Sequence, residues 1–191
     1  MKKLFDSIKE TLNSNPGAII AVEGMCASGK TTLANSLAEE YGFEIIHTDD
    51  FFLPFDMRTE ERLSQSGGNI HYERFVEEVA VPLKENRNFE YRVFDCSSGT
   101  YGKKRKIRCD RPVIIEGAYS LHPEIPDIYD LKIFLQISPV LQLERIEKRN
   151  DLQALEVFKE KWIPYENRYF DSFGIREKSD ILIEVNINEY R

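Results

Sequence analysis

The chain has 191 residues, of which 41% are hydrophobic and 31% are charged, and its formal net charge is -7. This length predicts one domain around a single core, and the composition is typical of a globular protein. The acidic balance argues against a general nucleic-acid binder, whose surface would be basic. No apolar run approaches the length of a membrane-spanning helix, and the three cysteines show neither a disulfide framework nor a metal-site spacing. We therefore expect a cytoplasmic protein with no membrane or nucleic-acid partner.

Residues 1–16 are predicted to form an amphipathic helix that ends at an Asn-, Pro- and Gly-rich stretch. The helix has basic residues but no continuous apolar core, so we do not expect a secretory signal. The apolar, mainly β-branched run 19–22 then predicts a buried strand. One face of the helix carries Leu4, Phe5, Ile8 and Leu12.

Residues 24–31 fill the phosphate-loop pattern G-x-x-x-x-G-K-[ST], between that strand and a helical pattern running to about Tyr41. Glycines let the backbone coil so that N–H groups point at a polyphosphate, and the helix adds the positive end of its dipole. Lys30 brings a charge to the outer phosphates, and the Thr31 hydroxyl is placed to bind Mg2+. The alternative is a glycine-rich turn that binds nothing. The predicted ATP-binding residues are Gly24, Ala27, Ser28, Gly29, Lys30, Thr31 and Thr32.

A second strand is predicted over 43–48, and it ends in the acidic pair Asp49 and Asp50. The segment 52–110 that follows is expected to be an insertion on the substrate side of the single domain. It begins with a polar stretch that ends in the breaker Ser66-Gly67-Gly68-Asn69, followed by a helix over 72–83. Pro82 should end or kink that helix.

The rest of the insertion is predicted to be a β-hairpin, with strands at 89–95 and 103–109 around the turn Ser97-Ser98-Gly99. Beyond it, two helices are expected, one beginning at Pro139 and one over 152–170 with a bend at Pro164. Three further strands are predicted at 111–117, 131–137 and 180–185.

Strands that alternate with helices predict an α/β fold of the P-loop NTPase type, a doubly wound parallel sheet of about five strands flanked by helices, with a small hairpin insertion. In such sheets ligands bind beyond the carboxyl ends of the strands. The polar residues that follow the apolar runs are therefore candidates for a site: Asp49, Asp50, Glu116, Tyr119 and Ser138.

Three kinds of nucleotide-dependent protein share such a loop. A GTPase switch needs N-K-x-D and D-x-x-G, whose nearest matches at 177–180 and 171–174 lie in the wrong places. A motor ATPase usually ends its Walker-B strand in Asp-Glu, where this chain has Glu116-Gly117. A small-molecule kinase needs an acid to deprotonate an acceptor hydroxyl and mobile cations to neutralise the transferring phosphoryl group.

The kinase interpretation finds its parts in the sequence. Asp49 should face the loop across the sheet edge, the alternative being an N-cap or structural carboxylate, and Asp50 is expected to be a cap or supporting group. Glu116 is expected to bind a Mg2+-bound water, or alternatively to form a strand-end salt bridge. Three cations follow the fourth strand and are either a closing lid or a solvated helix face. They are Arg145, Lys148 and Arg149.

Several other residues have weaker patterns. His71 and His122 could contact a substrate, although a single histidine is commonly a surface or core group. The basic run 102–106 is expected to be an exposed hairpin rather than a nucleic-acid site. Cys26 lies within the phosphate loop, where its oxidation could block nucleotide binding, or where it is simply a small residue that the loop tolerates.

The sequence resembles the uridine kinase family of P-loop nucleoside kinases, close to pantothenate kinase and phosphoribulokinase. The likeness spans about 17–185 and rests on four strings: GMCASGKTT, TDDFF, IIEGAYSLHP and LERIEKRND. The resemblance implies that Asp49 accepts the proton of a nucleoside 5'-hydroxyl. It also implies phosphate and Mg2+ roles for Lys30, Thr31 and the acid Glu116.

The same resemblance implies lid roles for Arg145 and Arg149, and an aromatic wall of the acceptor site at Phe52. Two features depart from the family. Members recognise the base with a hairpin aromatic and a nearby histidine, and here Phe94 supplies the aromatic while Ser97-Ser98-Gly99 offers no histidine. The lid is also short, because only Asn150 and Asp151 separate Arg149 from the next helix pattern.

We therefore predict an ATP- and Mg2+-dependent kinase of a small-molecule hydroxyl, with the 5'-hydroxyl of uridine or cytidine as the first acceptor. The alternatives are a kinase for another metabolite, such as a pantothenate-like or sugar substrate, and a nucleotide-binding module without catalysis. The predicted catalytic residues are Lys30, Asp49, Arg145 and Arg149. The predicted substrate-binding residues are Asp49, Phe52, His71, Phe94 and Tyr119, and the predicted metal ligands are Thr31 and Glu116.

Overall fold

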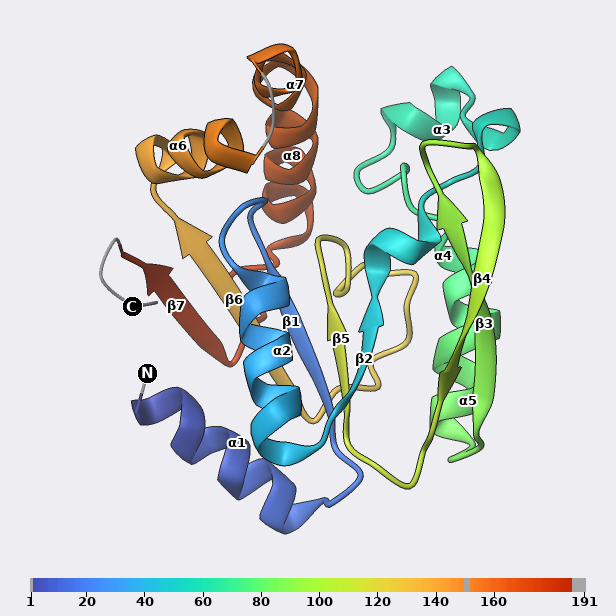
Figure 1. Cartoon of the computed structure of the whole chain (residues 1–191), viewed down its shortest axis with the longest axis vertical. Helices are drawn as coiled ribbons and strands as arrows, with labels where there is room; N and C mark the ends of the chain where they lie inside the picture. Colours follow the sequence, from blue (N-terminus) through green and yellow to red (C-terminus); the bar gives the residue numbers. More distant parts are fainter. Residues whose placement is uncertain (1, 150–151, 187–191) are drawn as a thin grey trace.

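The computed structural model describes residues 2–149 and 152–186. At its centre lies a five-stranded sheet with the order β2-β5-β1-β6-β7, in which every neighbouring pair is parallel. The carboxyl ends of the strands all point toward the top of Figure 1. This confirms the predicted doubly wound parallel sheet. The strands are β1 (Ile19–Gly24), β2 (Glu44–His47), β5 (Val113–Glu116), β6 (Leu131–Ile137) and β7 (Ile181–Val185).

The three middle strands are almost completely buried, which explains their continuous apolar sequences. Ile20, Ile114 and Ile133 each have no exposed side-chain surface and belong to one core cluster. Burying each such side chain stabilises the fold by about 1.5–3 kcal/mol. The sheet is therefore a rigid base for the loops that follow its strands.

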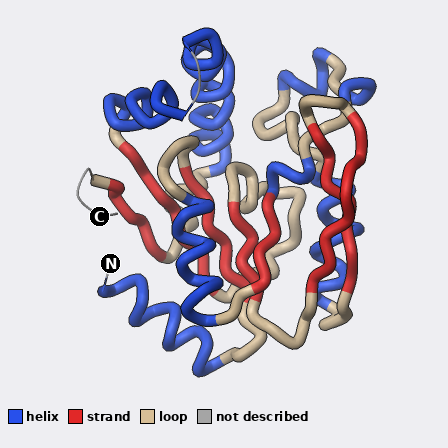
Figure 2. The backbone as a smooth tube through the Cα atoms, in the orientation of Figure 1, coloured by secondary structure: helices blue, strands red, loops and turns tan. Residues whose placement is uncertain are grey.

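Helices cover both faces of the sheet. The chain moves outward from β1 to β2 in one direction and from β6 to β7 in the other, and right-handed crossovers then place their helices on opposite faces. Figure 2 shows these layers. None of the helices in the described ranges is long and apolar enough to cross a membrane. The helices around the sheet are α1 (Lys2–Ser14), α2 (Lys30–Tyr41), α6 (Pro139–Arg149), α7 (Leu152–Val157) and α8 (Ile163–Phe173).

A second, smaller layer packs beside the β2 edge. Its antiparallel hairpin consists of β3 (Phe89–Asp95) and β4 (Thr100–Ile107), so the returning strand begins three residues earlier than predicted. It shares a core cluster with Ile46 of β2 and Ile115 of β5. The polar stretch that follows β2 contains a short helix, which Thr59 caps. The other elements are η1 (Thr48–Phe51), η2 (Phe55–Met57), α3 (Glu60–Ser64), α4 (Tyr72–Phe75), η3 (Val76–Ala80) and α5 (Val81–Lys84).

Pro82 and Pro164 neither end nor break their helices. Each lies in the first turn of an α-helix, α5 or α8, that directly follows a five-residue π turn. The π turns are η3 and η4 (Phe158–Trp162). A proline has no N–H to donate to the carbonyl of residue i−4, and its ring clashes with that carbonyl. The wider π turn accommodates both the missing hydrogen bond and the ring. The predicted bends are thus π turns within continuous helices.

Candidate active site

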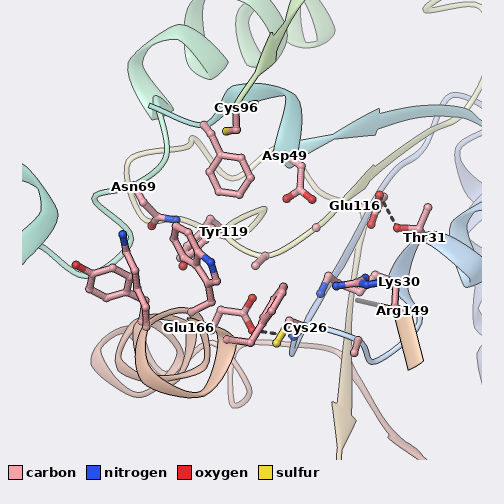
Figure 3. Close-up of a pocket in the computed structure, with 18 of the residues that line it drawn as sticks. Cys26, Lys30, Thr31, Asp49, Asn69, Cys96, Glu116, Tyr119, Arg149 and Glu166 are labelled. Atoms are coloured by element: carbon pink, nitrogen blue, oxygen red, sulfur yellow. Dashed lines mark hydrogen bonds between the residues drawn. The ribbon is translucent and has the colours of Figure 1, made fainter. Parts of the chain in front are cut away.

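A cavity of about 830 Å³ opens at the carboxyl edge of the sheet (Figure 3). The phosphate loop forms one wall, and residues from the segments after β2, β3 and β5, and from α6, η4 and α8, form the others. Five of the described lining residues are cations and three are carboxylates. The cations are Lys30, Arg58, Arg145, Arg149 and Lys161, and the carboxylates are Asp49, Glu116 and Glu166.

The phosphate loop has the backbone shape of an anion-binding turn. Ala27 and Gly29 have left-handed φ angles of 59° and 99°, and α2 begins at the next residue. Among the described residues, the N–H groups of Ala27, Gly29, Lys30 and Thr31 make no hydrogen bond to another protein group. Lys30 Nζ donates to the carbonyl of Gly24 at 2.7 Å. The loop thus offers unpaired donors and a held cation to a polyphosphate.

Three side chains brace this loop from outside. Gln142 Nε2 donates to the Cys26 carbonyl at 3.0 Å, and Arg145 Nη1 donates to the Ala27 carbonyl at 3.2 Å. From α8, Glu166 Oε2 accepts the Cys26 N–H at 2.7 Å. Burial raises the pKa of the Glu166 carboxyl, and the Lys30 charge opposes that rise. The loop is therefore clamped by α6 and α8 together.

Cys26 itself is inert as an acid. Burial, with the nearby Glu166 charge, raises the pKa of its thiol to about 12, and Gln142 Nε2 donates to its sulfur at 3.1 Å. A thiol held in the neutral form reacts slowly with oxidants, because the thiolate is the reactive species. The geometry favours the view of Cys26 as a small residue that the loop tolerates.

Asp49 lies on η1, directly after β2, and lines the same cavity as Lys30. Protein surrounds it on most sides, while the open cavity leaves its carboxylate accessible to solvent. Burial raises the pKa of the Asp49 carboxyl, Lys30 lowers it, and the charge on Glu116 raises it again. The group is thus a carboxylate with strengthened basicity, facing the phosphate loop as the sequence predicted.

The position of Asp49 depends on a glycine in the neighbouring strand end. Thr48 Oγ1 donates to the Ala118 carbonyl at 2.8 Å, which fixes the start of η1. Gly117 has a φ of +129°, and a Cβ there would lie 2.1 Å from Thr48 Oγ1. This close approach explains why a glycine stands where a Walker-B strand would have its second acid.

Asp50 has a different role from Asp49. Its side chain is buried, its Oδ2 accepts the Tyr91 hydroxyl at 2.9 Å, and it forms an ion pair with Arg105 Nε at 2.9 Å. Arg74 Nη2 donates to its carbonyl at 2.6 Å. Asp50 therefore ties η1 to the hairpin and α4, and does not line the cavity.

Glu116 and Thr31 place two oxygen atoms beside the phosphate loop. Thr31 Oγ1 donates to Glu116 Oε1 at 3.1 Å, and His47 Nδ1 lies 2.5 Å from the same oxygen. Mg2+ prefers oxygen ligands, keeps several waters and is commonly bound by one or two protein groups together with substrate phosphates. A hydroxyl and a carboxylate fit such an ion. No group of three His, Cys, Asp or Glu in residues 2–149 and 152–186 could hold a metal alone.

Opposite the loop, the cavity has an aromatic wall with a few polar groups. Its rings come from Phe52 and Phe55 after β2, Tyr119 after β5, and Phe158, Trp162 and Tyr165 on η4 and α8. The guanidinium of Arg58 lies 4.4 Å from the Phe55 ring centre and donates to the Leu53 carbonyl at 2.8 Å. No described carboxylate pairs with it. This wall is shaped for a small organic molecule.

The structure brings most predicted site residues to this cavity, but not all. Phe94 packs against Phe55 and Tyr101 behind the wall, and His71 does not line the cavity either. Gly24 and Ser28 belong to the loop without lining the cavity, and Lys148 lies outside it. Asn150 and Asp151 of the predicted lid fall outside the described residues. Those that do line it are Ala27, Gly29, Lys30, Thr31, Thr32, Asp49, Phe52, Glu116, Tyr119, Arg145 and Arg149.

The remaining sequence candidates have structural roles. His122 stacks on Tyr72 with a centroid distance of 4.7 Å, and burial lowers the pKa of its imidazole to about 4. Ser138 Oγ accepts the Leu141 N–H at 3.4 Å at the start of α6. Within the basic run, Lys104 forms an ion pair with Glu90 and Arg105 turns inward to Asp50. Lys104 thus pairs within the hairpin, and Arg105 ties the hairpin to η1.

Sequence patterns missed a buried acid below the loop. Glu23 has no exposed surface, and its Oε1 accepts the Gly24 N–H at 2.9 Å. Its Oε2 accepts from Leu121 N at 3.2 Å and from Tyr169 OH at 3.2 Å. Burial raises the pKa of this carboxyl to about 7. A charged residue inside an otherwise apolar strand run was the signal that could have identified it.

The comparisons with known proteins come from sequence and from structure. No protein-family model matches the chain. It is 27% identical over 167 residues to a cytidylate kinase of Thermotoga neapolitana, covering 76% of each chain. To a cytidylate kinase of Pyrococcus abyssi it is 27% identical over 160 residues, covering 82% of this chain and 76% of that protein.

Among solved structures, the chain is similar to a possible uridine kinase from Bacillus stearothermophilus. The TM-score is 0.66, with 18% identity and coverage of 95% of this chain and 99% of that one. This likeness shows the fold. Together, the relatives support the P-loop nucleoside and nucleotide kinases as a group rather than uridine kinases in particular.

Proposed function

We propose that this protein is an ATP-dependent kinase that transfers a phosphoryl group to a hydroxyl of a small molecule. The observation that carries the proposal is the position of Asp49, which lines one cavity with Lys30 and the phosphate loop. A general base and a polyphosphate site on opposite walls leave room for an alcohol between them. The cytidylate kinase relatives and the P-loop kinase fold support phosphoryl transfer.

Each residue has a distinct part in this reaction. The free N–H groups of the loop and Lys30 would hold the outer phosphates of ATP. Asp49 would orient the acceptor hydroxyl and accept its proton, and Arg145 and Arg149 would stabilise charge on the transferring group. Thr31 and Glu116 are the residues that would hold Mg2+, which when bound supplies positive charge at the phosphates.

The first candidate acceptor is a nucleoside, with the 5'-hydroxyl of uridine or cytidine as the reacting group. The rings of the aromatic wall support it, because a pyrimidine ring packs well between such side chains. The second candidate is an anionic acceptor, either a nucleotide or a carboxylate-bearing metabolite. The guanidinium of Arg58, which forms no ion pair with a described carboxylate, supports it, because arginine pairs with phosphate and carboxylate in a bidentate manner.

A panel of acceptors tests the proposal and separates the candidates. ADP release from Mg-ATP would be measured with uridine, cytidine, cytidine 5'-monophosphate, pantothenate, ribose and ethanol, each against a water blank. A kinase should show at least one acceptor that raises the rate well above the blank, and product analysis should find the phosphate on that acceptor. If ATP binds but no acceptor raises the rate, a nucleotide-binding module without catalysis is the better description.

A further inference from the structure

The turn Gly67-Gly68-Asn69 between α3 and α4 is packed more tightly than a connecting loop requires. A Cβ on Gly68 would lie 1.9 Å from the Arg62 carbonyl oxygen. Gly67 has a φ of +77°, and a Cβ there would lie 2.5 Å from the His122 ring. Only glycines therefore allow the chain to run this close to α3 and to the buried His122.

Backbone pairing fixes the residue at the end of this turn. The Asn69 carbonyl accepts the Leu53 N–H at 2.9 Å, and Phe52 forms a β-bridge with Ile70. Asn69 is thus fastened to the segment that follows Asp49 and carries the ring of Phe52. The turn is built to hold one side chain in a set position relative to the predicted base.

That side chain is a buried amide without a partner. Asn69 is 9% exposed and lines the cavity, and its Nδ2 makes no hydrogen bond within the described part of the chain. It lies close to the Tyr119 hydroxyl, whose pKa it lowers against the stronger effect of burial, but without hydrogen-bond geometry. Figure 3 shows Asn69 on the wall opposite the phosphate loop. Buried polar groups in native proteins are nearly always paired, so an orphan donor at a cavity wall points to a missing ligand.

We propose that the Gly67-Gly68-Asn69 turn is the acceptor-recognition element of this cavity, and that the Asn69 amide donates a hydrogen bond to an oxygen of the phosphoryl acceptor. The inference rests on the proposed kinase function. It adds that the acceptor carries a second oxygen, in a carbonyl, hydroxyl or anionic group, besides the hydroxyl that reacts. A simple alcohol would leave the amide unpaired and would be a poor substrate.

The test compares Asn69→Ala and Asn69→Asp with wild type, using uridine, cytidine and cytidine 5'-monophosphate as probes. Alanine removes the donor, and we expect the acceptor KM to rise about tenfold. Aspartate replaces the donor by an acceptor of similar shape, and we expect a larger rise. The KM for ATP and the turnover at saturating acceptor should change less than about threefold. Asn35→Asp, an exposed position on α2, is the matched control and should change nothing.

A second measurement keeps the inference separate from the kinase proposal. In 15N-labelled protein, the Asn69 side-chain amide signals, assigned by their loss in Asn69→Ala, should shift when a probe binds together with a non-hydrolysable ATP analogue. A shift without turnover supports Asn69 and overturns the kinase proposal. Turnover with an unchanged acceptor KM in both variants overturns the role of Asn69 and leaves the kinase standing. If neither turnover nor a shift is observed, both proposals are overturned.

Discussion

The two walls of the cavity are built in different ways. The phosphate wall comes from one contiguous stretch, 24–32, whose shape is set by glycines, by backbone N–H groups and by the start of α2. The acceptor wall combines side chains from four distant segments, between Asp49 and Asn69, at Cys96, from Gly117 to Tyr119, and on η4 and α8. One wall is local in sequence and the other is assembled by the fold.

Because of this difference, the two walls suit different ligands. Backbone groups cannot distinguish one triphosphate-bearing molecule from another at the phosphates, so the local wall suits a common donor. Side chains from separate elements can change one at a time, so the assembled wall suits a choice among acceptors. Substitutions that change the kinetics of one ligand and not of the other would locate the boundary between the two walls.

The largest expected effect is at Asp49, a residue of the acceptor wall that lines the same cavity as the phosphate wall. Asp49→Asn should lower turnover by about 10²- to 10⁴-fold, because the base is lost, while the KM for ATP stays nearly constant. The base must be ionised, and its pKa is raised, so wild-type turnover should rise with pH through a range above that of an ordinary aspartate. Steady-state kinetics over pH would measure both effects.

Asp50→Asn is the control for that variant. Its ion pair with the partly exposed Arg105 supports the hairpin, so we expect lower stability and turnover per folded molecule within a few-fold of wild type. Equal loss of turnover in the two variants would contradict the assignment of the base to Asp49.

The next effect concerns the glycine that lets η1 approach β5. Gly117→Ala should lower the free energy of unfolding by roughly 3 to 5 kcal/mol, because φ is +129° and the new methyl group meets Thr48. Gly42→Ala separates the two causes, since it has a φ of +76° with nothing within 4 Å of a Cβ. That control should cost only about 1 kcal/mol in urea denaturation. Equal losses would show that the contact with Thr48 is unimportant.

Glu23 supports the phosphate wall from below and gives it a pH dependence. Its pKa is about 7 in the fold against 4.5 for the free group, so the folded state favours the protonated acid. Protonation of Glu23 in the fold therefore adds on the order of 3 kcal/mol to the free energy of unfolding. This stabilisation is fully present below pH 4.5 and is lost as pH rises through 7. Glu23→Gln should remove this pH dependence, whatever its effect on stability at one pH. Parallel slopes for the two proteins between pH 4.5 and 7.5 would contradict it.

The smallest effect is expected at Glu166, which reaches from α8 onto the phosphate loop. Triphosphate near its carboxylate favours protonation, so wild-type affinity for ATP should fall as pH rises through the raised pKa of Glu166. Glu166→Gln keeps an oxygen for the Cys26 N–H and removes the charge. We expect a two- to fivefold gain in ATP affinity at neutral pH and a flat pH dependence, measured by calorimetry. An unchanged pH dependence would place the titrating group elsewhere.

Much of the fold was predictable, because strand and helix periodicity are local properties. The run from Leu131 to Ile137 was predicted with its observed bounds, since a buried parallel strand reads as continuous apolar residues. The two prolines were expected to end, kink or bend their helices, and the π turns that precede them were not foreseen, because a π turn depends on how the whole helix packs and leaves no simple sequence pattern.

The site was predictable where a motif or a strand end dictated it. Lys30, Thr31, Asp49 and Glu116 lie at or after the carboxyl ends of strands that meet at one sheet edge, so topology alone brings them together. Asn69, Trp162 and Glu166 were missed, because their approach to the cavity depends on the packing of insertions and of α8. Phe94 was placed in the site by resemblance, and the structure instead packs it behind Phe55.

The π turn at Phe158–Trp162 gives the helix that forms part of the acceptor wall an adjustable joint. A π turn is an α-helix with one residue gained, and each residue of an α-helix advances about 100° around its axis. Deletion of one residue there would keep the hydrogen bond between Glu166 and the Cys26 N–H. The helical turns before the deletion would rotate, and Phe158 would leave the cavity wall. Insertions and deletions of a single residue could thus remodel acceptor choice in this scaffold without disturbing its grip on the nucleotide.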